Sequence, residues 1–244
     1  MGYKHEELKP YNEKGEKRNQ IEEMFNNIAP EYDKFNYLVS MHLDKIWRVC
    51  AILSLKPFAP RKVLDIATGT GDLAILTDKL LAPESIIGCD ISEGMMAVAN
   101  EKCIKRGITT IKFEKEDCTA LSYPDNSFDA VTSSFGIRNF QNLDKALGEM
   151  FRVLQPDGHL VLLELSSPSR FPMKQLFPFY AKYIMPQLGY LFSNDRKAYQ
   201  YLPDSIAAFP QGETMKRILE ETGFRNVTFR RFAGGVCTFY LAEK

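Results

Sequence analysis

Short apolar segments alternate with longer amphipathic segments along most of the chain after residue 61. The short segments are bounded by turn residues, as is typical of buried strands, and the longer ones have the apolar spacing of helices. The predicted strands are Val63–Ile66, Ser85–Cys89, Thr110–Glu114, Phe128–Ser133 and His159–Glu164. The predicted helices between them are Leu73–Leu81, Glu93–Arg106 and Leu143–Val153. This alternation predicts an α/β fold, a doubly wound and mostly parallel sheet with helices on both faces.

The first 60 residues lie outside this alternation. Residues 1–20 are polar and charged and are expected to form a flexible leader. Helices are predicted at Ile21–Ile28 and Asp44–Leu55. We therefore expect residues 1–60 to form a leader and a helical cap on a domain that spans residues 61–244.

The last part of the chain also departs from the alternation. An apolar helical insertion is expected at about residues 171–210, and a helix at Thr214–Thr222 follows it. Two further strands are predicted at Asn226–Phe232 and Val236–Leu241, linked by Gly234-Gly235. Because a Gly-Gly link is a hairpin signal, we expect a seven-stranded sheet that ends in an antiparallel hairpin.

Composition and charge narrow the classes of function. The chain has 244 residues, of which 45% are hydrophobic and 25% charged, as in an ordinary globular protein. Its 31 basic and 31 acidic residues balance, so no nucleic-acid partner is expected. We find no signal peptide, no apolar segment of membrane-spanning length and no C-x-x-C pair. These features predict a cytoplasmic protein, and the spacing of His5, His42 and His159 predicts no metal site.

The most informative segment, Val63–Leu73, combines a strand, a glycine turn and the start of a helix. This arrangement places free backbone N–H groups at the edge of a sheet. The carboxylates of Asp65 and Asp72 flank the turn, and Asp90 ends the next strand, nineteen residues after Gly71. An acidic residue at this distance is typical of a site that binds the hydroxyls of a ribose.

Two kinds of nucleoside cofactor fit this pattern. Gly69–Ala74 matches G-x-G-x-x-G/A, so a dinucleotide such as NAD, and with it an oxidoreductase, is one alternative. A carboxylate on the turn would repel a pyrophosphate, whereas S-adenosylmethionine has a sulfonium and an ammonium group and no phosphate. The charges therefore favour S-adenosylmethionine.

Three further segments stand out: Tyr32–Asn36 with Ser40 and Trp47, Ser134–Asn139, and Arg152–Ser166. They resemble the signatures of the ubiquinone/menaquinone biosynthesis C-methyltransferases, a family of class I S-adenosylmethionine-dependent methyltransferases with a Rossmann-like fold. The resemblance extends from about Lys17 to the end of the chain and includes Tyr201–Ile206. The chain departs from the family at Phe35, where the family usually has Met, and at Asp44, where it often has His. We therefore assign no catalytic role to position 44.

The resemblance implies a cofactor site at the carboxyl ends of the strands. Thr70 would bind the methionine carboxylate, Asp90 the ribose hydroxyls, Asp117 the adenine amino group and the N–H of Cys118 a ring nitrogen. The implied cofactor-binding residues are Asp65, Gly69, Thr70, Gly71, Asp90, Asp117, Cys118 and Ser134.

The resemblance also implies C-methylation of a demethylated polyprenyl quinol, with demethylmenaquinol favoured and a benzoquinol of ubiquinone biosynthesis as the alternative. Arg138 would stabilise a developing phenolate or orient a water, the alternative being an ion pair with a nearby acid. The implied substrate-side residues are Tyr32, Asp33, Asn36 and Tyr201. A cofactor-binding subunit without catalytic activity is a further alternative.

The aromatic segment Phe171–Phe192 is the candidate for the isoprenoid pocket. Its apolar surface would open toward the inner face of the cell membrane, in a peripheral contact. A helix that covers the sheet, or a contact between two copies of the chain, would explain the same pattern.

Overall fold

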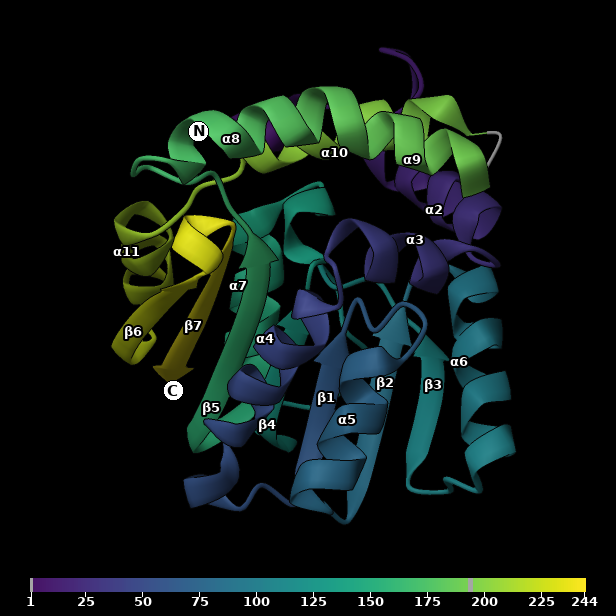
Figure 1. Ribbon diagram of the computed structural model, residues 1–244. Coiled ribbons are helices and arrows are strands. Elements are labelled where there is room, and N and C mark those ends of the chain that lie inside the picture. Colours follow the sequence, from purple (N-terminus) through teal and green to yellow (C-terminus); the bar gives the residue numbers. More distant parts are fainter. Residues whose placement is uncertain (1, 193–194) are drawn as a thin grey trace.

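A seven-stranded sheet forms the centre of this computed structural model, which describes residues 2–192 and 195–244 (Figure 1). The parallel strands are β1 (Lys62–Ile66), β2 (Ser85–Asp90), β3 (Ile111–Lys115), β4 (Phe128–Ser134) and β5 (Leu154–Leu165). Two strands complete the sheet in antiparallel pairing, β7 (Cys237–Glu243) beside β5 and β6 (Arg225–Phe232) at the edge. The order is β3-β2-β1-β4-β5-β7-β6, so the predicted fold class is confirmed.

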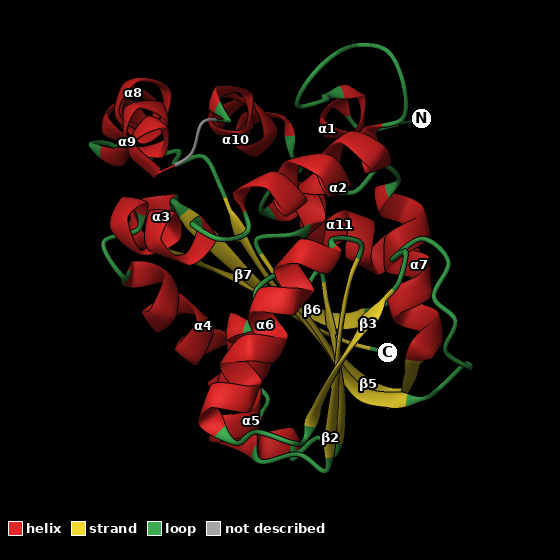
Figure 2. Ribbon diagram, turned by 90° about the vertical axis from the view of Figure 1, so that its right-hand side faces the viewer, coloured by secondary structure: helices red, strands yellow, loops and turns green. Residues whose placement is uncertain are grey.

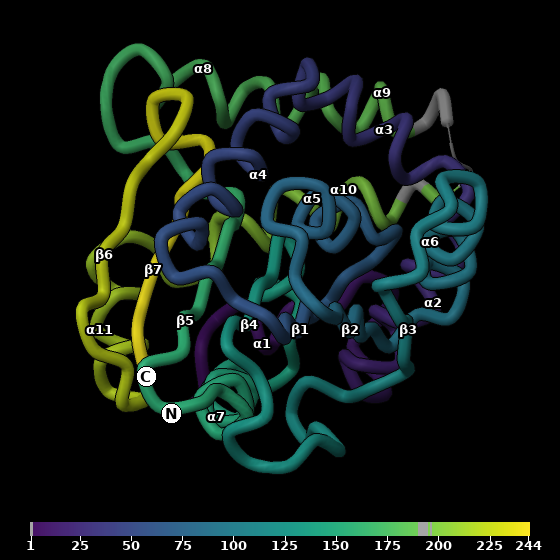
Figure 3. Tube along the Cα trace, turned by 90° about the horizontal axis from the view of Figure 1, so that it is seen from below, coloured from purple at the N-terminus to yellow at the C-terminus, as the bar shows by residue number. Residues whose placement is uncertain are grey.

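Helices cover both faces of the sheet, because the parallel strands are apolar on both sides. One face is covered by α4 (Leu43–Leu53), α5 (Asp72–Leu81) and α6 (Glu93–Arg106). The other face is covered by α7 (Leu143–Val153) and α11 (Glu213–Thr222) (Figure 3). Within β5, Leu162 belongs to the core of one face and Val161 to the core of the other.

A layer of helices lies across the carboxyl ends of the parallel strands (Figure 1). Its outer part consists of α8 (Met173–Phe179), the π-helical turn η3 (Tyr180–Ile184), α9 (Met185–Phe192) and α10 (Arg196–Ala208). Its inner part consists of α2 (Lys17–Ile28) and α3 (Tyr32–Val39), which lie between the outer helices and the sheet (Figure 2). This layer encloses the edge of the sheet at which the candidate site residues lie.

The N-terminal segment is not the flexible leader that its composition predicted. It contains the short helix α1 (Lys4–Glu7), and the buried ring of His5 packs against Phe209. Lys17 is also buried, and its ammonium donates hydrogen bonds to the carbonyls of His5 at 2.6 Å, Phe140 at 3.3 Å and Arg138 at 3.4 Å. The prediction was wrong because acceptors distant in sequence satisfy this charge, and local composition does not reveal them.

The predicted hairpin is confirmed, although its link is longer than two glycines. The short helical turn η4 (Ala233–Gly235) and Val236 join β6 to β7. Two other short turns, η1 (Lys56–Phe58) and η2 (Ile137–Asn139), precede β1 and follow β4. Of these turns, η2 is important for the site because it contains Arg138.

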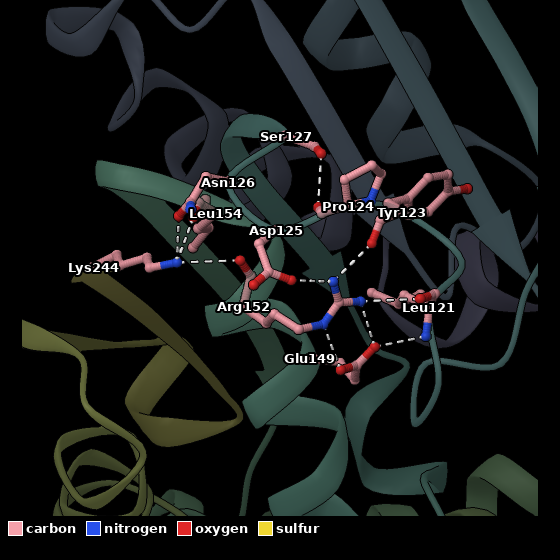
Figure 4. A network of polar contacts seen from close by, with 10 residues as sticks. All are labelled: Leu121, Tyr123, Pro124, Asp125, Asn126, Ser127, Glu149, Arg152, Leu154 and Lys244. Carbon is pink, nitrogen blue, oxygen red and sulfur yellow. Dashed lines mark hydrogen bonds and ion pairs between the residues drawn. The ribbon is translucent and has the colours of Figure 1, made fainter.

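A network of hydrogen bonds and ion pairs lies at the end of the sheet opposite the carboxyl ends of the parallel strands (Figure 4). Arg152, in the last turn of α7, donates to Glu149 and Asp125 at 2.8 Å and to the carbonyls of Leu121 and Tyr123. Lys244 donates to the carbonyl of Arg152 at 3.2 Å. The network joins the loop before β4, the end of α7 and the C-terminal residue, far from the carboxyl ends of the strands.

Candidate active site

Two adjoining cavities of about 270 Å³ each lie between the carboxyl edge of the sheet and the helical layer. The first, here called the loop cavity, lies over the glycine turn that follows β1. The second, the cap cavity, is lined by residues of α3, α4, α8 and α10. Both cavities are lined by Phe25, Tyr32, Phe135 and Asn139. A molecule in one cavity would therefore lie directly beside a molecule in the other.

Five of the predicted cofactor-binding residues line the loop cavity: Gly69, Asp90, Asp117, Cys118 and Ser134. They follow β1, β2, β3 and β4, whose carboxyl ends meet at this edge. This is the position at which ligands bind in open α/β sheets.

Asp90 connects the glycine turn to the end of β2. Its carboxylate accepts hydrogen bonds from the backbone N–H of Gly69 at 2.8 Å and of Ser92 at 2.9 Å. Burial raises the pKa of Asp90, although these N–H groups act in the opposite direction. The arrangement fixes the carboxylate at the cavity wall, where its remaining lone pairs can accept hydrogen bonds from ligand hydroxyls.

The other three predicted cofactor residues do not line the loop cavity. Asp65 is buried beneath the turn, where it accepts hydrogen bonds from the hydroxyls of Thr68 and Thr132, both at 2.6 Å. Burial raises the pKa of Asp65 to about 6. Gly71 has a positive φ of 77°, and a Cβ there would lie 2.9 Å from Ala99 Cβ. Asp65 and Gly71 therefore support the conformation of the glycine turn and do not line the cavity.

Thr70 lies outside the cavity, on the side of the turn that faces α3. Its hydroxyl donates to Asp33 at 2.6 Å, and Asp33 in turn forms an ion pair of 2.5 Å with Lys102. Lys102 also pairs with Asp72 at 2.7 Å. The structure therefore brings Thr70 and Asp33 together, but it places neither at the wall of either cavity.

This finding changes the electrostatic argument about the turn. The nearby cation Lys102 lowers the pKa of Asp72 against the effect of burial, so its carboxylate is paired rather than free to repel a phosphate. The loop cavity is nevertheless lined by four acidic side chains and two basic ones: Glu16, Asp90, Glu116, Asp117, Arg18 and Lys145. The acidic excess comes from the cavity wall, not from the first turn of α5.

Three predicted substrate-side residues line the cap cavity: Tyr32, Asn36 and Tyr201. Arg138 lines it too, and its guanidinium forms an ion pair of 2.7 Å with Glu164. Burial disfavours the charged guanidinium, but Glu164, Tyr32 and Tyr201 together act in the opposite direction, and the pKa of Arg138 is raised. The sequence analysis offered an ion pair as the alternative to a role at the site, and the structure shows the pair at the cavity wall.

Residues that the sequence analysis did not single out also line these cavities. Asn139 lines both, and neither atom of its buried amide group has a hydrogen-bond partner among the described residues. Arg18 lines the loop cavity and pairs with Asp117 at 3.1 Å. Asn139 lies beside Arg138 in a segment that resembles the family, so the sequence could have identified it as a site residue. Arg18 lay in the supposed leader and gave none.

The cap cavity is mainly apolar, and it has an exposed mouth. Phe177, Tyr180 and Met185 line its interior, whereas Met41 and Leu176 line it while being 72% and 57% exposed. The aromatic and apolar positions of Phe171–Phe192 are thus divided between a buried and an exposed face. The side chains of Tyr190, Leu191 and Phe192 lie outside the described residues.

Within residues 2–192 and 195–244, the helices are too short or too polar to cross a membrane. The same residues contain no cluster of side chains suited to a metal ion.

Known proteins resemble this chain over its whole length. A demethylmenaquinone methyltransferase from Bacteroides fragilis is 55% identical over 245 residues, covering 100% of both chains. One from Porphyromonas gingivalis is 44% identical and covers 98% of both chains. A ubiquinone/menaquinone biosynthesis C-methyltransferase UbiE from Geobacter sulfurreducens is 41% identical, covering 95% of this chain and 90% of its own.

Solved structures share the fold at low sequence identity. The [4+2]-cyclase SpnF has a TM-score of 0.68 at 16% identity and covers 93% of this chain and 96% of its own. A SAM-dependent methyltransferase from Thermotoga maritima has a TM-score of 0.65 at 19% identity, covering 91% and 99%. The model of the ubiE/COQ5 methyltransferase family matches residues 12–244, and the chain belongs to this family.

Proposed function

We propose that this methyltransferase transfers the methyl group of S-adenosylmethionine to a ring carbon of demethylmenaquinol, which yields menaquinol. The main support is the pair of adjoining cavities, one with an excess of acidic side chains in its lining, the other mainly apolar, that share Tyr32 and Asn139. A nucleoside cofactor fits the first and a polyprenyl quinol fits the second. The names of relatives at 55% and 44% identity support the naphthoquinol over the benzoquinol.

The loop cavity suits S-adenosylmethionine, which supplies an electrophilic methyl group on a sulfonium. Asp90 would accept hydrogen bonds from the ribose hydroxyls, and Asp117 from the adenine amino group once its pair with Arg18 opens. The N–H of Cys118 would donate to the adenine ring, and Gly69 and Ser134 would flank the cofactor. Asp65, Gly71 and Thr70 would support the turn, with Thr70 close to the methionine end.

The acceptor carbon must be electron-rich, and it becomes so as the neighbouring hydroxyl loses its proton. The Arg138 guanidinium, held by Glu164, would stabilise the negative charge that develops on that oxygen. Asn139 has a free amide at the boundary of the two cavities and would orient the same oxygen. Tyr32, Asn36 and Tyr201 would enclose the ring, and alignment of the carbon with the methyl group provides much of the rate.

We also propose how the chain is divided. Residues 1–60 would form the N-terminal segment and a helical cap, and residues 61–244 the methyltransferase domain with its apolar helical insertion at about 171–210. The cap and the insertion together would form most of the acceptor side of the site, to which Arg138 also belongs. The lining of the cap cavity supports this division, because most of its residues come from these two segments.

We propose further that the mouth of the cap cavity meets the inner face of the membrane, where the prenyl tail resides. Leu176, Phe179 and Tyr183 form an exposed apolar stripe at helical spacing, and Arg170, Lys174 and Lys182 are nearby in the sequence. Residues 165–192 contain no acidic residue, so this face suits an anionic lipid surface. A dimer that buries the same stripe is the alternative.

The test of the reaction uses the purified chain alone. It is incubated with methyl-labelled S-adenosylmethionine and reduced demethylmenaquinol, with the demethylated benzoquinol in parallel. We expect label in menaquinol and a much slower reaction of the benzoquinol. Binding of NAD in place of S-adenosylmethionine, or no transfer without a second protein, would contradict the proposal.

The test of the surface is flotation with anionic and neutral vesicles, compared between the wild type and Phe179→Ser. We expect binding to anionic vesicles that the substitution weakens. Sedimentation of the same two proteins tests the alternative. A wild-type dimer that Phe179→Ser dissociates, together with no vesicle binding by either protein, would contradict the membrane contact.

A further inference from the structure

The cap cavity has a second charged group besides Arg138. Of its lining side chains, three are charged: Asp44, Arg48 and Arg138. Arg138 has its own counter-ion in Glu164, and Asp44 and Arg48 form a separate ion pair on α4. The cavity wall therefore offers two guanidinium groups, each paired with a carboxylate, in an otherwise mainly apolar surface.

The second pair is well ordered by its neighbours. Asp44 and Arg48 are 3% and 6% exposed, and their spacing of four places them on the same face of α4. The hydroxyl of Ser40, which also lines the cavity, donates to Asp44 at 2.6 Å. The Arg48 guanidinium lies 5.0 Å from the centre of the Phe135 ring, which borders both cavities.

One hydrogen-bond donor of the Asp44–Arg48 pair has no acceptor among the described residues. Nη1 of Arg48 donates to Asp44, while its buried Nε has no hydrogen-bond partner among the described residues. Such an unused donor is costly when buried unless a ligand or water completes it. Stability does not account for the pair either, because replacing a buried ion pair with apolar residues is often neutral or stabilising.

Tyr32 relates the two pairs in space. Burial raises the pKa of its phenol, and the positive charges of both Arg138 and Arg48 act in the opposite direction. Tyr32, Arg48 and Arg138 all line the cap cavity, in which an acceptor ring would lie. Both groups are thus available to a small planar molecule beside Tyr32.

We propose that Ser40, Asp44 and Arg48 bind the second hydroxyl of the quinol, the one remote from Arg138. This inference rests on the proposed quinol substrate. A 1,4-quinol has hydroxyls on opposite sides of the ring, and a carboxylate beside a guanidinium accepts from and donates to such a group. The remote hydroxyl is not conjugated with the carbon that is methylated, so the cluster orients the ring and is a positioning group.

The proposal predicts a specific dependence on substrate. The wild type, Arg48→Gln and Arg48→Lys are assayed with demethylmenaquinol and with an analogue whose remote hydroxyl is replaced by hydrogen. We expect the wild type to prefer the quinol by about tenfold in kcat/KM, which is equivalent to about 1.4 kcal/mol. Arg48→Gln should abolish this preference mainly by raising KM for the quinol, and Arg48→Lys should restore part of it.

Two further variants keep the test independent of folding. Ser40→Ala removes one hydrogen bond to Asp44 and should reduce the preference slightly, and Lys105→Gln, at an exposed pair with Glu101, should leave it unchanged. A preference that survives in Arg48→Gln and Ser40→Ala, or an equal loss on both substrates, overturns the inference. If the wild type methylates neither compound, the proposed function fails instead.

Discussion

Replacing Glu164 by glutamine removes the charge that faces the Arg138 guanidinium in the cap cavity. Glu164 is 1% exposed, and its carboxylate accepts hydrogen bonds from Arg138 Nη1 at 2.7 Å and from the N–H of Leu165 at 2.8 Å. Removing one partner of a buried pair costs about 3–5 kcal/mol, because the other charge stays buried without compensation. Glutamine keeps one acceptor oxygen, so we expect a loss near the lower end, about 3 kcal/mol.

The loss should be visible in both stability and rate. For a chain of this size 1 kcal/mol corresponds to roughly 2–4 °C in Tm, so calorimetry should show a fall of roughly 6–12 °C. We expect kcat for methyl transfer to fall by more than about tenfold, because in the proposed reaction Arg138 would no longer be held against the developing charge. Cofactor affinity, measured by calorimetric titration, should change little, because Glu164 lies outside the lining of the loop cavity.

Glu149→Gln is the matched control. Glu149 also accepts hydrogen bonds from an arginine, Arg152, and from a backbone N–H, that of Leu121 (Figure 4). This pair is partly exposed and lies outside both cavities, so we expect a loss of about 1 kcal/mol or less and an unchanged kcat. A Glu164→Gln protein with wild-type Tm and kcat would refute the assigned role of the pair, as would an equal loss of kcat in both variants.

Three other predictions concern the cofactor, the turn and acid stability. Asp90→Asn should weaken S-adenosylmethionine binding roughly tenfold to hundredfold in a titration, because it removes a charged acceptor; unchanged binding would contradict a ribose contact. In Gly88→Ala, on β2, the new Cβ would lie 2.8 Å from Phe113 of β3 and 2.9 Å from Thr68 of the turn, so urea unfolding should show a loss of roughly 1–3 kcal/mol, and an unaltered midpoint would show that these side chains move aside. Burial, aided by Lys17, lowers the pKa of His5 to about 3, well below its ordinary 6.5. Between these pH values only the unfolded chain binds a proton on His5. The contribution of the neutral His5 to the free energy of unfolding is therefore complete above pH 6.5 and is lost at about 1.4 kcal/mol per pH unit as pH falls toward 3. Asp65, whose pKa is about 6, changes stability with the opposite sign over the same pH range, but it does so in both wild type and His5→Leu. The difference between the two proteins therefore isolates the contribution of His5. Parallel curves of unfolding free energy against pH would contradict the prediction.

The sequence by itself determined the order of strands and helices and which residues lie at the carboxyl ends of the strands. Strands such as β2 and β4 are short apolar runs, and their last residues, Asp90 and Ser134, had to lie at the carboxyl edge of a parallel sheet. The family resemblance added Arg138, whose position at the cap cavity the structure shows. The predictions of the strands and of which residues lie at this edge succeeded because they depend on periodicity and on neighbours along the chain, whereas Arg138 came from the resemblance.

Only the tertiary structure decided which side chains share a cavity. Thr70, in the turn, and Asp65, in β1, were expected at the cofactor, yet they form hydrogen bonds with Asp33 and Thr132, from distant elements, and do not line the loop cavity. Lys17 was predicted to be part of a flexible leader, but its buried ammonium donates hydrogen bonds to carbonyls more than a hundred residues away in the sequence. The physical reason is that a polar group is satisfied by whichever partner the packed fold brings within about 3 Å, and sequence distance does not reveal that partner.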